Sequence, residues 1–357
     1  METKKIKARL ELEDGSVFQG YSFGAQASVA GEVVFNTSMV GYPESLTDPS
    51  YFGQILVLTY PLIGNYGVPE SQIVDGLDAW FESSRVQITG LIISEYSFDH
   101  HHWSARKSLA QWLIEHNVPG LFGIDTRMLT KRLREEGTML GRILFFTEQK
   151  NFYDPNKINL VEHVSIKEPV NYGRGDKKVV LVDCGAKDNI IRCLNERDIM
   201  VRRVPWNYDF TNEDFDGVMI SNGPGDPKMC RDTVAVVQKA MDVGKPIFGI
   251  CMGNQILALA AGGDTYKLKF GHRSQNQPSI EVGTKRCYIT SQNHGYAVDG
   301  RTLPEGWEPW FVNANDGTNE GIRHTSKPFR SVQFHPEAAP GPVDTAILFD
   351  DFKRMMI

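Results

Sequence analysis

Cys251 is the residue best suited to nucleophilic chemistry in this sequence. It lies in GICMG, residues 249–253, between the apolar stretch 247–250 and a run of helix-forming residues. Small residues on both sides of a nucleophile allow a sharp strand-to-helix turn that holds its side chain clear of a sheet. The positive end of the following helix favours a thiolate. The pattern therefore predicts a catalytic cysteine, and the alternative is a cysteine that only begins a helix in the core.

A base for this thiol is offered by SVQFHPEAAPGP, in which residues 331–334 have the pattern of a strand. His335 and Glu337 follow that strand, with the rigid Pro336 between them. The imidazole could exchange a proton with the nucleophile while the carboxylate fixes its tautomer. An isolated His-Pro-Glu sequence is more often a solvated strand end, but its place after a strand favours the catalytic interpretation.

Two further motifs have polar or backbone groups that could bind a ligand. The stretch ISNGPGDP, residues 220–227, runs from a strand into a loop with two glycines. The loop amides could hold an oxyanion together with the amide of Met252, although alone the loop is only a turn. His100, His101 and His102 are adjacent in DHHHWS. Metal ligands converge from spaced positions, so we expect a solvated loop there and no metal site.

The composition limits what these residues can belong to. The chain has 357 residues, 41% of them hydrophobic, and a net charge of −6, which fits a globular protein of two or three domains. No apolar run approaches the ~20 residues that cross a bilayer, and the first residues lack the apolar core of a secretory signal. The chain has no extended basic tract, which argues against nucleic-acid binding. It also has no phosphate-binding loop, which argues against ATP binding. We therefore expect a cytoplasmic protein without nucleic-acid or membrane partners.

The two halves of the chain predict different architectures. Residues 1–150 combine strand-like stretches with two helices, one expected to be capped by Ser104 and the other to run from Asp125 to Gly137, which indicates an α+β domain. Residues 151–177 are polar and aperiodic, as in a linker. From residue 178 to 357, buried-strand and helical patterns alternate. This alternation predicts an α/β domain with a mostly parallel sheet, helices on both faces, and a ligand site at the carboxyl ends of the strands.

The other cysteines do not suggest a disulfide framework. The chain has 5 cysteines, an odd number, and no CxxC pair, which suits a reducing compartment. We interpret Cys193 and Cys287, and less firmly Cys184 and Cys230, as small buried hydrophobic residues.

Taken together, several motifs resemble a known family. Four motifs of the second half, GICMGNQ, SNGPGDP, SQNHGYAVD and FHPE, resemble those of the class I (triad) glutamine amidotransferase domain. The first-half stretches GEVVFNTSMVGYPESLTDPSY, LTYPLIGNYG and DTRMLTKRLREEGTM resemble the amino-terminal domain of the carbamoyl-phosphate synthase small subunit. The resemblance covers nearly the whole chain, and its first-half motifs are the more specific.

This resemblance implies hydrolysis of glutamine to glutamate and ammonia, with a large subunit that makes carbamoyl phosphate from ammonia, bicarbonate and ATP. It implies that Cys251 is the nucleophile, that His335 is the base and then the acid, and that Glu337 orients His335. It implies an oxyanion hole formed by the amides of Gly223 and Met252. The residues that it implies for glutamine binding are Ser50, Gly223, Gly225, Met252, Gln255, Asn293, Gly295 and Tyr296. It implies no cofactor in this chain, with ATP and Mg²⁺ used by the large subunit.

The sequence departs from the family pattern GICLGHQ at Met252 and Asn254, and Tyr296 replaces a common Phe. Asn254 removes a titratable ring expected near the thiolate, which leaves the rate and the pH profile open. The ending FDDFKRMMI suggests a separate subunit in a heterodimer that serves pyrimidine or arginine synthesis. Two alternatives remain: a stand-alone cysteine hydrolase on the same scaffold, and a catalytically silent regulatory subunit.

Overall fold

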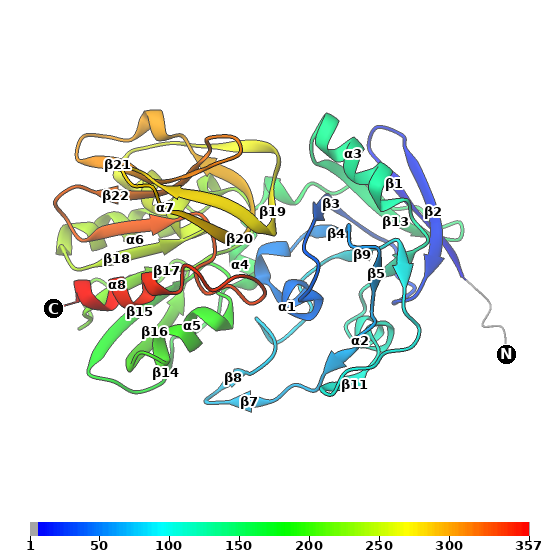
Figure 1. Cartoon of the computed structure of the whole chain (residues 1–357), viewed down its shortest axis with the longest axis horizontal. Coiled ribbons are helices and arrows are strands. Elements are labelled where there is room, and N and C mark those ends of the chain that lie inside the picture. Colours follow the sequence, from blue (N-terminus) through cyan, green and yellow to red (C-terminus); the bar gives the residue numbers. More distant parts are fainter. Residues whose placement is uncertain (1–5, 357) are drawn as a thin grey trace. The chain divides into compact units, whose positions relative to one another are not determined.

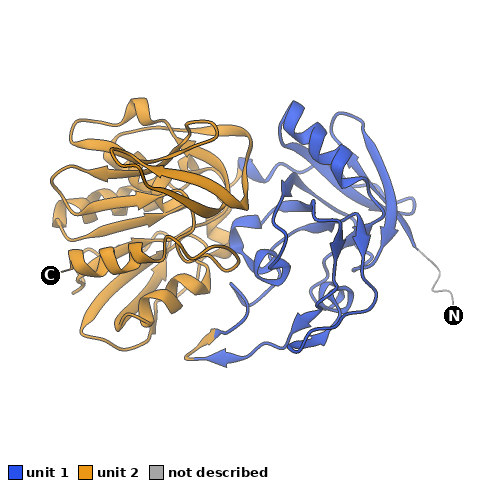
Figure 2. Ribbon diagram, viewed as in Figure 1, with its two compact units in different colours: residues 1–74, 78–157 blue, residues 75–77, 158–357 orange. Residues whose placement is uncertain are grey.

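The computed structural model describes residues 6–356, coloured along the sequence in Figure 1. The chain divides into two compact units, coloured separately in Figure 2. Unit 1 holds residues 1–74 and 78–157, and unit 2 holds residues 75–77 and 158–357. Within residues 6–356, every helix is too short or too polar to cross a membrane.

Unit 1 is built on a closed barrel, whose strands follow one another in the order β1-β13-β3-β4-β9-β12-β2. These strands are β1 Lys7–Leu12, β2 Val17–Ser22, β3 Val29–Asn36, β4 Gln54–Leu58, β9 Gly90–Ile92, β12 Gly120–Phe122 and β13 Met139–Phe145. In β1, the buried residues Ala8, Leu10 and Leu12 alternate with more exposed ones. This period of two places one face of the strand in the apolar core.

The longer helices of unit 1 begin and end at capping residues. Helix α3, Thr126–Glu136, is capped by the Asp125 carboxylate, which accepts from the Met128 amide at 2.8 Å, and ends at Gly137 as predicted. Helix α2 is Leu109–Glu115, and its N-cap is Ser108. The expected cap at Ser104 is therefore wrong, because the residues that follow it form strand β11, Ala105–Lys107.

The remaining elements of unit 1 are short, and β8 runs into its boundary with unit 2. They are α1 Tyr42–Thr47, η1 Pro49–Tyr51, β5 Leu62–Ile63, β6 Val68–Pro69, β7 Ile73–Val74, β8 Leu77–Asp78, β10 Glu95–Tyr96 and η2 Pro155–Lys157.

The segment 151–177, predicted as a linker, carries regular structure beyond residue 157. It contains helix α4, Val161–Val164, and strand β14, Val170–Tyr172. Strand β14 pairs antiparallel with β16, Ile199–Pro205, and so becomes the edge of the unit 2 sheet. Only three residues form this strand, too few for a hydrophobic period to be visible in the sequence.

Unit 2 contains a ten-stranded sheet in the order β14-β16-β15-β17-β18-β23-β22-β21-β19-β20. Its further strands are β15 Lys177–Asp183, β17 Gly217–Ile220, β18 Ile247–Ile250, β19 Thr265–Glu281, β20 Cys287–Val298, β21 Trp307–Asn313, β22 Asn319–His324 and β23 Phe329–Val332. The pairs from β16 to β23 are parallel, as the alternating pattern predicts. The pairs among β23, β22, β21, β19 and β20 are antiparallel, an extension that the sequence did not indicate.

Helices cover both faces of the parallel strands. Alternate residues of β15 point to opposite sides: Leu181 packs in the cluster that includes helices α5, Asp188–Asn195, and α8, Ile347–Met355. Val182 packs in the cluster that includes α6, Arg231–Val243, and α7, Met252–Ala261. Such a two-faced sheet explains the continuous apolar runs of its strands. The short turns η3 Pro227–Met229 and η4 Gly300–Thr302 complete the unit.

Candidate active site

Cys251 lies at the turn between β18 and helix α7, where its backbone has φ 54° and ψ −102°. This conformation is unfavourable for a residue with a Cβ, and such strain is often held at functional sites. The flanking glycines make the turn possible. A Cβ on Gly249 would collide with the Gly253 carbonyl, and a Cβ on Gly253 would collide with the Ile220 carbonyl. The predicted elbow is therefore present, with a positive-φ cysteine at the N-cap of the helix.

The Cys251 thiol is held in the interior of unit 2. Its side chain belongs to a buried cluster, and its Sγ lies 3.6 Å from the carbonyl oxygen of Asn293. The Cys251 amide donates to the Val332 carbonyl of β23 at 2.8 Å. This bond joins the elbow to the strand that leads to His335.

His335 and Glu337 follow β23 and form a buried pair. The Nδ1 atom of His335 lies 2.6 Å from Oε1 of Glu337. The carboxylate accepts a hydrogen bond from Nδ1–H, so whenever the ring is neutral its lone pair is on Nε2. Among the described residues, Nε2 makes no hydrogen bond, which leaves it available for proton exchange. Strand β23 ends at Val332, two residues earlier than predicted.

Lys187 is a functional candidate that the sequence reasoning missed. It follows β15, and its Nζ lies 3.2 Å from Oε1 of Glu337, with both side chains almost fully buried. The Lys187 ammonium also donates to the Ala338 carbonyl, and the Asn189 side chain donates to the Glu337 carbonyl. A lysine after a buried strand is a weak signal, because nothing in the sequence says which carboxylate it meets.

The charges of this cluster stabilise one another. Burial raises the pKa of Glu337, but Lys187 and His335 lower it more, to about 2. Burial lowers the pKa of His335, but the Glu337 carboxylate and the Cys251 sulfur raise it more. The imidazolium form of His335 is therefore favoured.

The loop after β17 contains the glycines predicted to bind an oxyanion and glutamine. A Cβ on Gly223 would collide with the Cys184 carbonyl, and Gly225 has φ 88°, so both positions suit glycine. Met252 is the first residue of helix α7, where amides lack partners within the helix. Its N–H group is therefore suited to donate a hydrogen bond to a ligand oxygen that develops negative charge.

The other predicted glutamine-binding residues lie in helix α7, in strand β20 and, for Ser50, in unit 1. Gln255 donates through Nε2 to the Tyr296 carbonyl at 2.8 Å, and the Asn293 carbonyl faces the Cys251 sulfur. Gly295 lies between Asn293 and Tyr296 in β20. Ser50 lies in η1 of unit 1, where it is buried and its amide donates to the Asp48 carboxylate at 2.9 Å.

Asn254, which replaces the family's usual histidine, is held by hydrogen bonds to neighbouring side chains. Its side chain is buried, donates to Oε1 of Gln333 at 3.1 Å and accepts from the Ser331 hydroxyl at 2.8 Å. Gln255 donates to the same Gln333 oxygen at 3.0 Å. Asn254 therefore ties helix α7 to Ser331 of β23 and to Gln333 just beyond that strand, a role visible only in the fold.

Other cysteines and histidines lie outside this site. All 5 cysteines are free, with Cys184 and Cys230 buried as expected. Cys287 is exposed, so the interpretation of it as a buried residue is wrong: it begins β20 next to the Lys285–Arg286 turn. His101 and His102 are exposed in a loop, and the Nδ1 atom of His102 lies 2.7 Å from the Ser104 hydroxyl.

Comparisons with known proteins identify both halves of the chain. Residues 180–355 match the family Glutamine amidotransferase class-I. Residues 10–143 match the family Carbamoyl-phosphate synthase small chain, CPSase domain. These two matches cover unit 2 and unit 1 respectively.

Curated relatives are similar over almost the whole chain. The mitochondrial carbamoyl-phosphate synthase [ammonia] of Homo sapiens is 52% identical over 99% of this chain and 24% of its own length. The multifunctional protein CAD of Squalus acanthias is 55% identical over 97% of this chain and 16% of its own length. The multifunctional protein URA2 of Saccharomyces cerevisiae is 50% identical over 96% of this chain and 17% of its own length.

The chain thus spans a quarter or less of the length of these relatives. Its two matched domains occur in the order expected from the first-half and second-half motifs. The chain belongs to the carbamoyl-phosphate synthase small-chain family, with a class I glutamine amidotransferase domain as its second half.

Proposed function

We propose that this chain is the glutaminase part of a glutamine-hydrolysing carbamoyl-phosphate synthase. The observation that carries the proposal is the buried thiol at a strained elbow after β18, together with a buried histidine–carboxylate pair that follows the neighbouring parallel strand β23. Membership in the family supports glutamine as the amide that is cut.

In the proposed reaction, the Cys251 thiolate attacks the side-chain carbonyl carbon of glutamine. The amides of Gly223 and Met252 would stabilise the oxyanion, whose charge exists only in the tetrahedral intermediate. The imidazolium of His335 then gives its proton to the leaving nitrogen, and ammonia departs as the carbon–nitrogen bond breaks. What remains is a thioester between Cys251 and the glutamyl group.

Water completes the cycle. His335, now neutral, takes a proton from a water molecule that attacks the thioester, and the carbon–sulfur bond breaks to release glutamate and the thiolate. Glu337 keeps Nδ1 protonated through both steps, and Lys187 keeps Glu337 ionised. The sum is glutamine plus water to glutamate plus ammonia.

The remaining parts of the proposal concern the partner. We assign Ser50, Gly225, Gln255, Asn293, Gly295 and Tyr296, with Gly223 and Met252, to glutamine binding. Ammonia would pass to a large synthetase subunit or domain, which uses bicarbonate, ATP and Mg²⁺. This chain would need no cofactor of its own and would work in the cytoplasm. Unit 1 would dock the partner, whose state would alter glutamine turnover.

The test is an assay of glutamate release by the full chain, alone and with a carbamoyl-phosphate synthase large subunit, bicarbonate and ATP. We expect slow hydrolysis alone, faster hydrolysis with the partner, and carbamoyl phosphate formed from glutamine nitrogen. Labelling of Cys251 by a glutamine-like electrophile should stop both reactions. Absence of glutamate release under every condition would refute the proposal, and hydrolysis that no synthetase partner stimulates would indicate a stand-alone hydrolase.

A further inference from the structure

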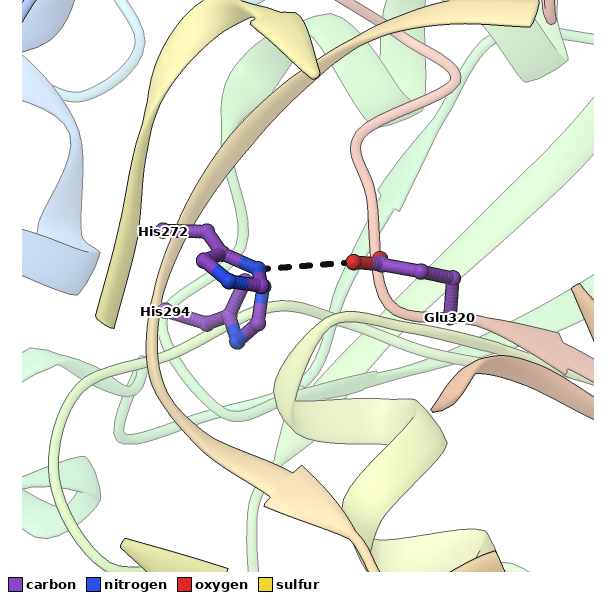
Figure 3. A group of neighbouring side chains, drawn as sticks. All are labelled: His272, His294 and Glu320. Carbon is purple, nitrogen blue, oxygen red and sulfur yellow. Dashed lines mark ion pairs between the residues drawn. The ribbon is translucent and has the colours of Figure 1, made fainter. Parts of the chain in front are cut away.

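His272, His294 and Glu320 form a second buried cluster in unit 2. They come from β19, β20 and β22, in the antiparallel part of the sheet. One nitrogen or oxygen atom of each lies within 4.8 Å of those of the other two. Figure 3 shows the two imidazoles side by side, with Glu320 directed toward them.

In its neutral form, His272 presents an unprotonated nitrogen to the cluster. Its Nε2 lies 2.9 Å from Oδ2 of Asp316, so the Asp316 carboxylate fixes the proton on Nε2. Its Nδ1 is buried, has no hydrogen-bond partner among the described residues, and lies 3.4 Å from Oε1 of Glu320. A buried lone pair that faces a carboxylate needs a proton or a cation between them.

His294 is oriented in the same way by a backbone acceptor. Its Nδ1 lies 2.8 Å from the Tyr296 carbonyl, which fixes the proton on Nδ1 and a lone pair on Nε2. That Nε2 lies 3.1 Å from Oε1 of Gln292. Exchanging the oxygen and nitrogen of the Gln292 amide would lose a hydrogen bond, because its Nε2 donates to Oε2 of Glu320 at 2.9 Å. Two lone pairs therefore face each other at this contact.

Glu320 is the carboxyl group of the cluster; burial raises its pKa, and a bound cation would favour its ionised form. Its side chain is fully buried, and its Oε1 also accepts from Nδ2 of Asn313 at 2.9 Å. Within residues 6–356, the ion pairs place no lysine or arginine on this carboxylate, only His272. The cluster thus combines two outward-fixed imidazoles and an anionic oxygen, the outer-sphere arrangement typical of metal-ligating histidines.

We propose that His272, His294 and Glu320 bind one divalent transition-metal cation, best matched by Zn²⁺, with Oε1 of Gln292 facing the fourth position. Zinc–nitrogen bonds of about 2.0–2.1 Å place tetrahedral ligands about 3.3 Å apart. The 3.4 Å separation of His272 and Glu320 already fits this geometry. The widest separation is within 4.8 Å, so binding would draw the ligands together by up to about 1.5 Å.

The proposed metal would act on the segment that carries the candidate glutamine site. His294 lies between Asn293 and Gly295, and the Tyr296 carbonyl that orients it also accepts from Gln255. A bound cation should therefore raise the melting temperature and hold this segment in one conformation. The proposal does not depend on glutamine hydrolysis, because metal binding is measured directly.

The test uses the full chain, stripped of metal with a chelator and titrated with Co²⁺. We expect one Co²⁺ per chain, the visible absorption of tetrahedral Co²⁺ with nitrogen and oxygen ligands, and displacement by Zn²⁺. His272→Gln should abolish this binding, whereas His324→Gln, on β22 but outside the cluster, should preserve it. Asp316→Asn should weaken it by about 10- to 100-fold, since it removes an outer partner of a ligand.

Asp316→Asn also controls for misfolding, because the half-exposed Asp316 side chain can be replaced without leaving a cavity in the core. Circular dichroism of each variant should match the wild type. The proposal is overturned if the wild type binds no Co²⁺, if His272→Gln and Glu320→Gln bind it as well as wild type, or if absorption bands of cobalt–thiolate bonds place it at a cysteine. In those cases a second proton on His272 fills the gap.

Discussion

Both units contain parallel strands, but candidate catalytic residues follow these strands only in unit 2. In unit 1, β3, β4 and β9 are parallel but belong to a closed barrel whose core is apolar. In unit 2, β15, β17, β18 and β23 are parallel in an open sheet, and Lys187, Cys251 and His335 follow three of their carboxyl ends. In open α/β sheets, ligands bind in the crevice outside the carboxyl ends of the strands.

Buried acids show the same contrast. Glu32 of unit 1 accepts hydrogen bonds from the neutral groups of Gln54 and Thr138, at 3.0 and 3.1 Å. Glu337 of unit 2 instead meets an imidazole and an ammonium. Neutral partners hold an acid in place, whereas charged partners also set the protonation states of their neighbours. We therefore expect the chemistry in unit 2.

The largest expected effect follows from Cys251→Ser. A hydroxyl at this elbow has no thiolate character, so glutamate release should fall to background while ammonia-dependent synthesis by the complete enzyme persists. Cys287→Ser, which changes an exposed cysteine of the same unit, is the matched control and should leave the rate unchanged. Near-normal glutamine use by Cys251→Ser would show that Cys251 is not the nucleophile.

His335→Asn should lower kcat for glutamine hydrolysis by about 10²- to 10⁴-fold, the usual contribution of a general acid–base group. Glu337→Gln should cost less, because an amide oxygen can still accept from Nδ1 although the counter-charge is lost. Steady-state kinetics across pH would show this order. Small and equal losses at both positions would place the base elsewhere.

Lys187→Met tests whether the buried cation sets the state of Glu337. Removal of one partner of a buried pair costs about 3–5 kcal/mol of unfolding free energy. In the wild type, Lys187 helps to lower the pKa of Glu337 from 4.5 to about 2. Stability from this lowered pKa is present above pH 4.5 and lost as the pH falls toward 2.

The difference in unfolding free energy between Lys187→Met and wild type should therefore shrink below pH 4.5, as measured by denaturant titration. Lys178→Met, which breaks an exposed pair with Asp214, should leave the unfolding free energy close to that of the wild type. A pH-independent loss at Lys187 would mean that the lysine contributes packing alone.

Ser50→Ala asks whether unit 1 is as inert as the comparison of the units suggests. If Ser50 binds glutamine, loss of one hydrogen bond worth about 0.5–1.5 kcal/mol should raise KM about 2- to 10-fold with a smaller change in kcat. Ser16→Ala, in the turn between β1 and β2, provides the control. An unchanged KM would confine the glutamine site to unit 2.

Asn254→Ala should have the smallest effect on turnover. It removes the acceptor of the Ser331 hydroxyl and one of the two donors to Gln333, so the unfolding free energy of unit 2 should fall by about 1–3 kcal/mol. Because the Asn254 side chain bonds to Gln333 and Ser331, the pH dependence of kcat should keep its wild-type shape. A shifted pH profile would show that Asn254 acts on the titrating groups.

Local signals in the sequence were enough to place the elbow and the triad candidates. The glycines at 249 and 253 predict the turn at Cys251, and strand β18 has the predicted bounds. Asp125 and Gly137 predict the ends of α3 because a cap and a C-terminal glycine act within one turn of helix. The error at Ser104 arose because Ser108 is an equally good cap four residues later.

The residues proposed to carry chemistry can be recognised without the fold, because the turn at Cys251 and the spacing of His335 and Glu337 depend on neighbours along the chain. Which distant groups meet them depends on the tertiary structure. Lys187 reaches Glu337 across 150 residues, and His272 reaches Glu320 from another strand. Such meetings depend on the order and register of strands in the sheet, which pair segments that have no local signal for one another.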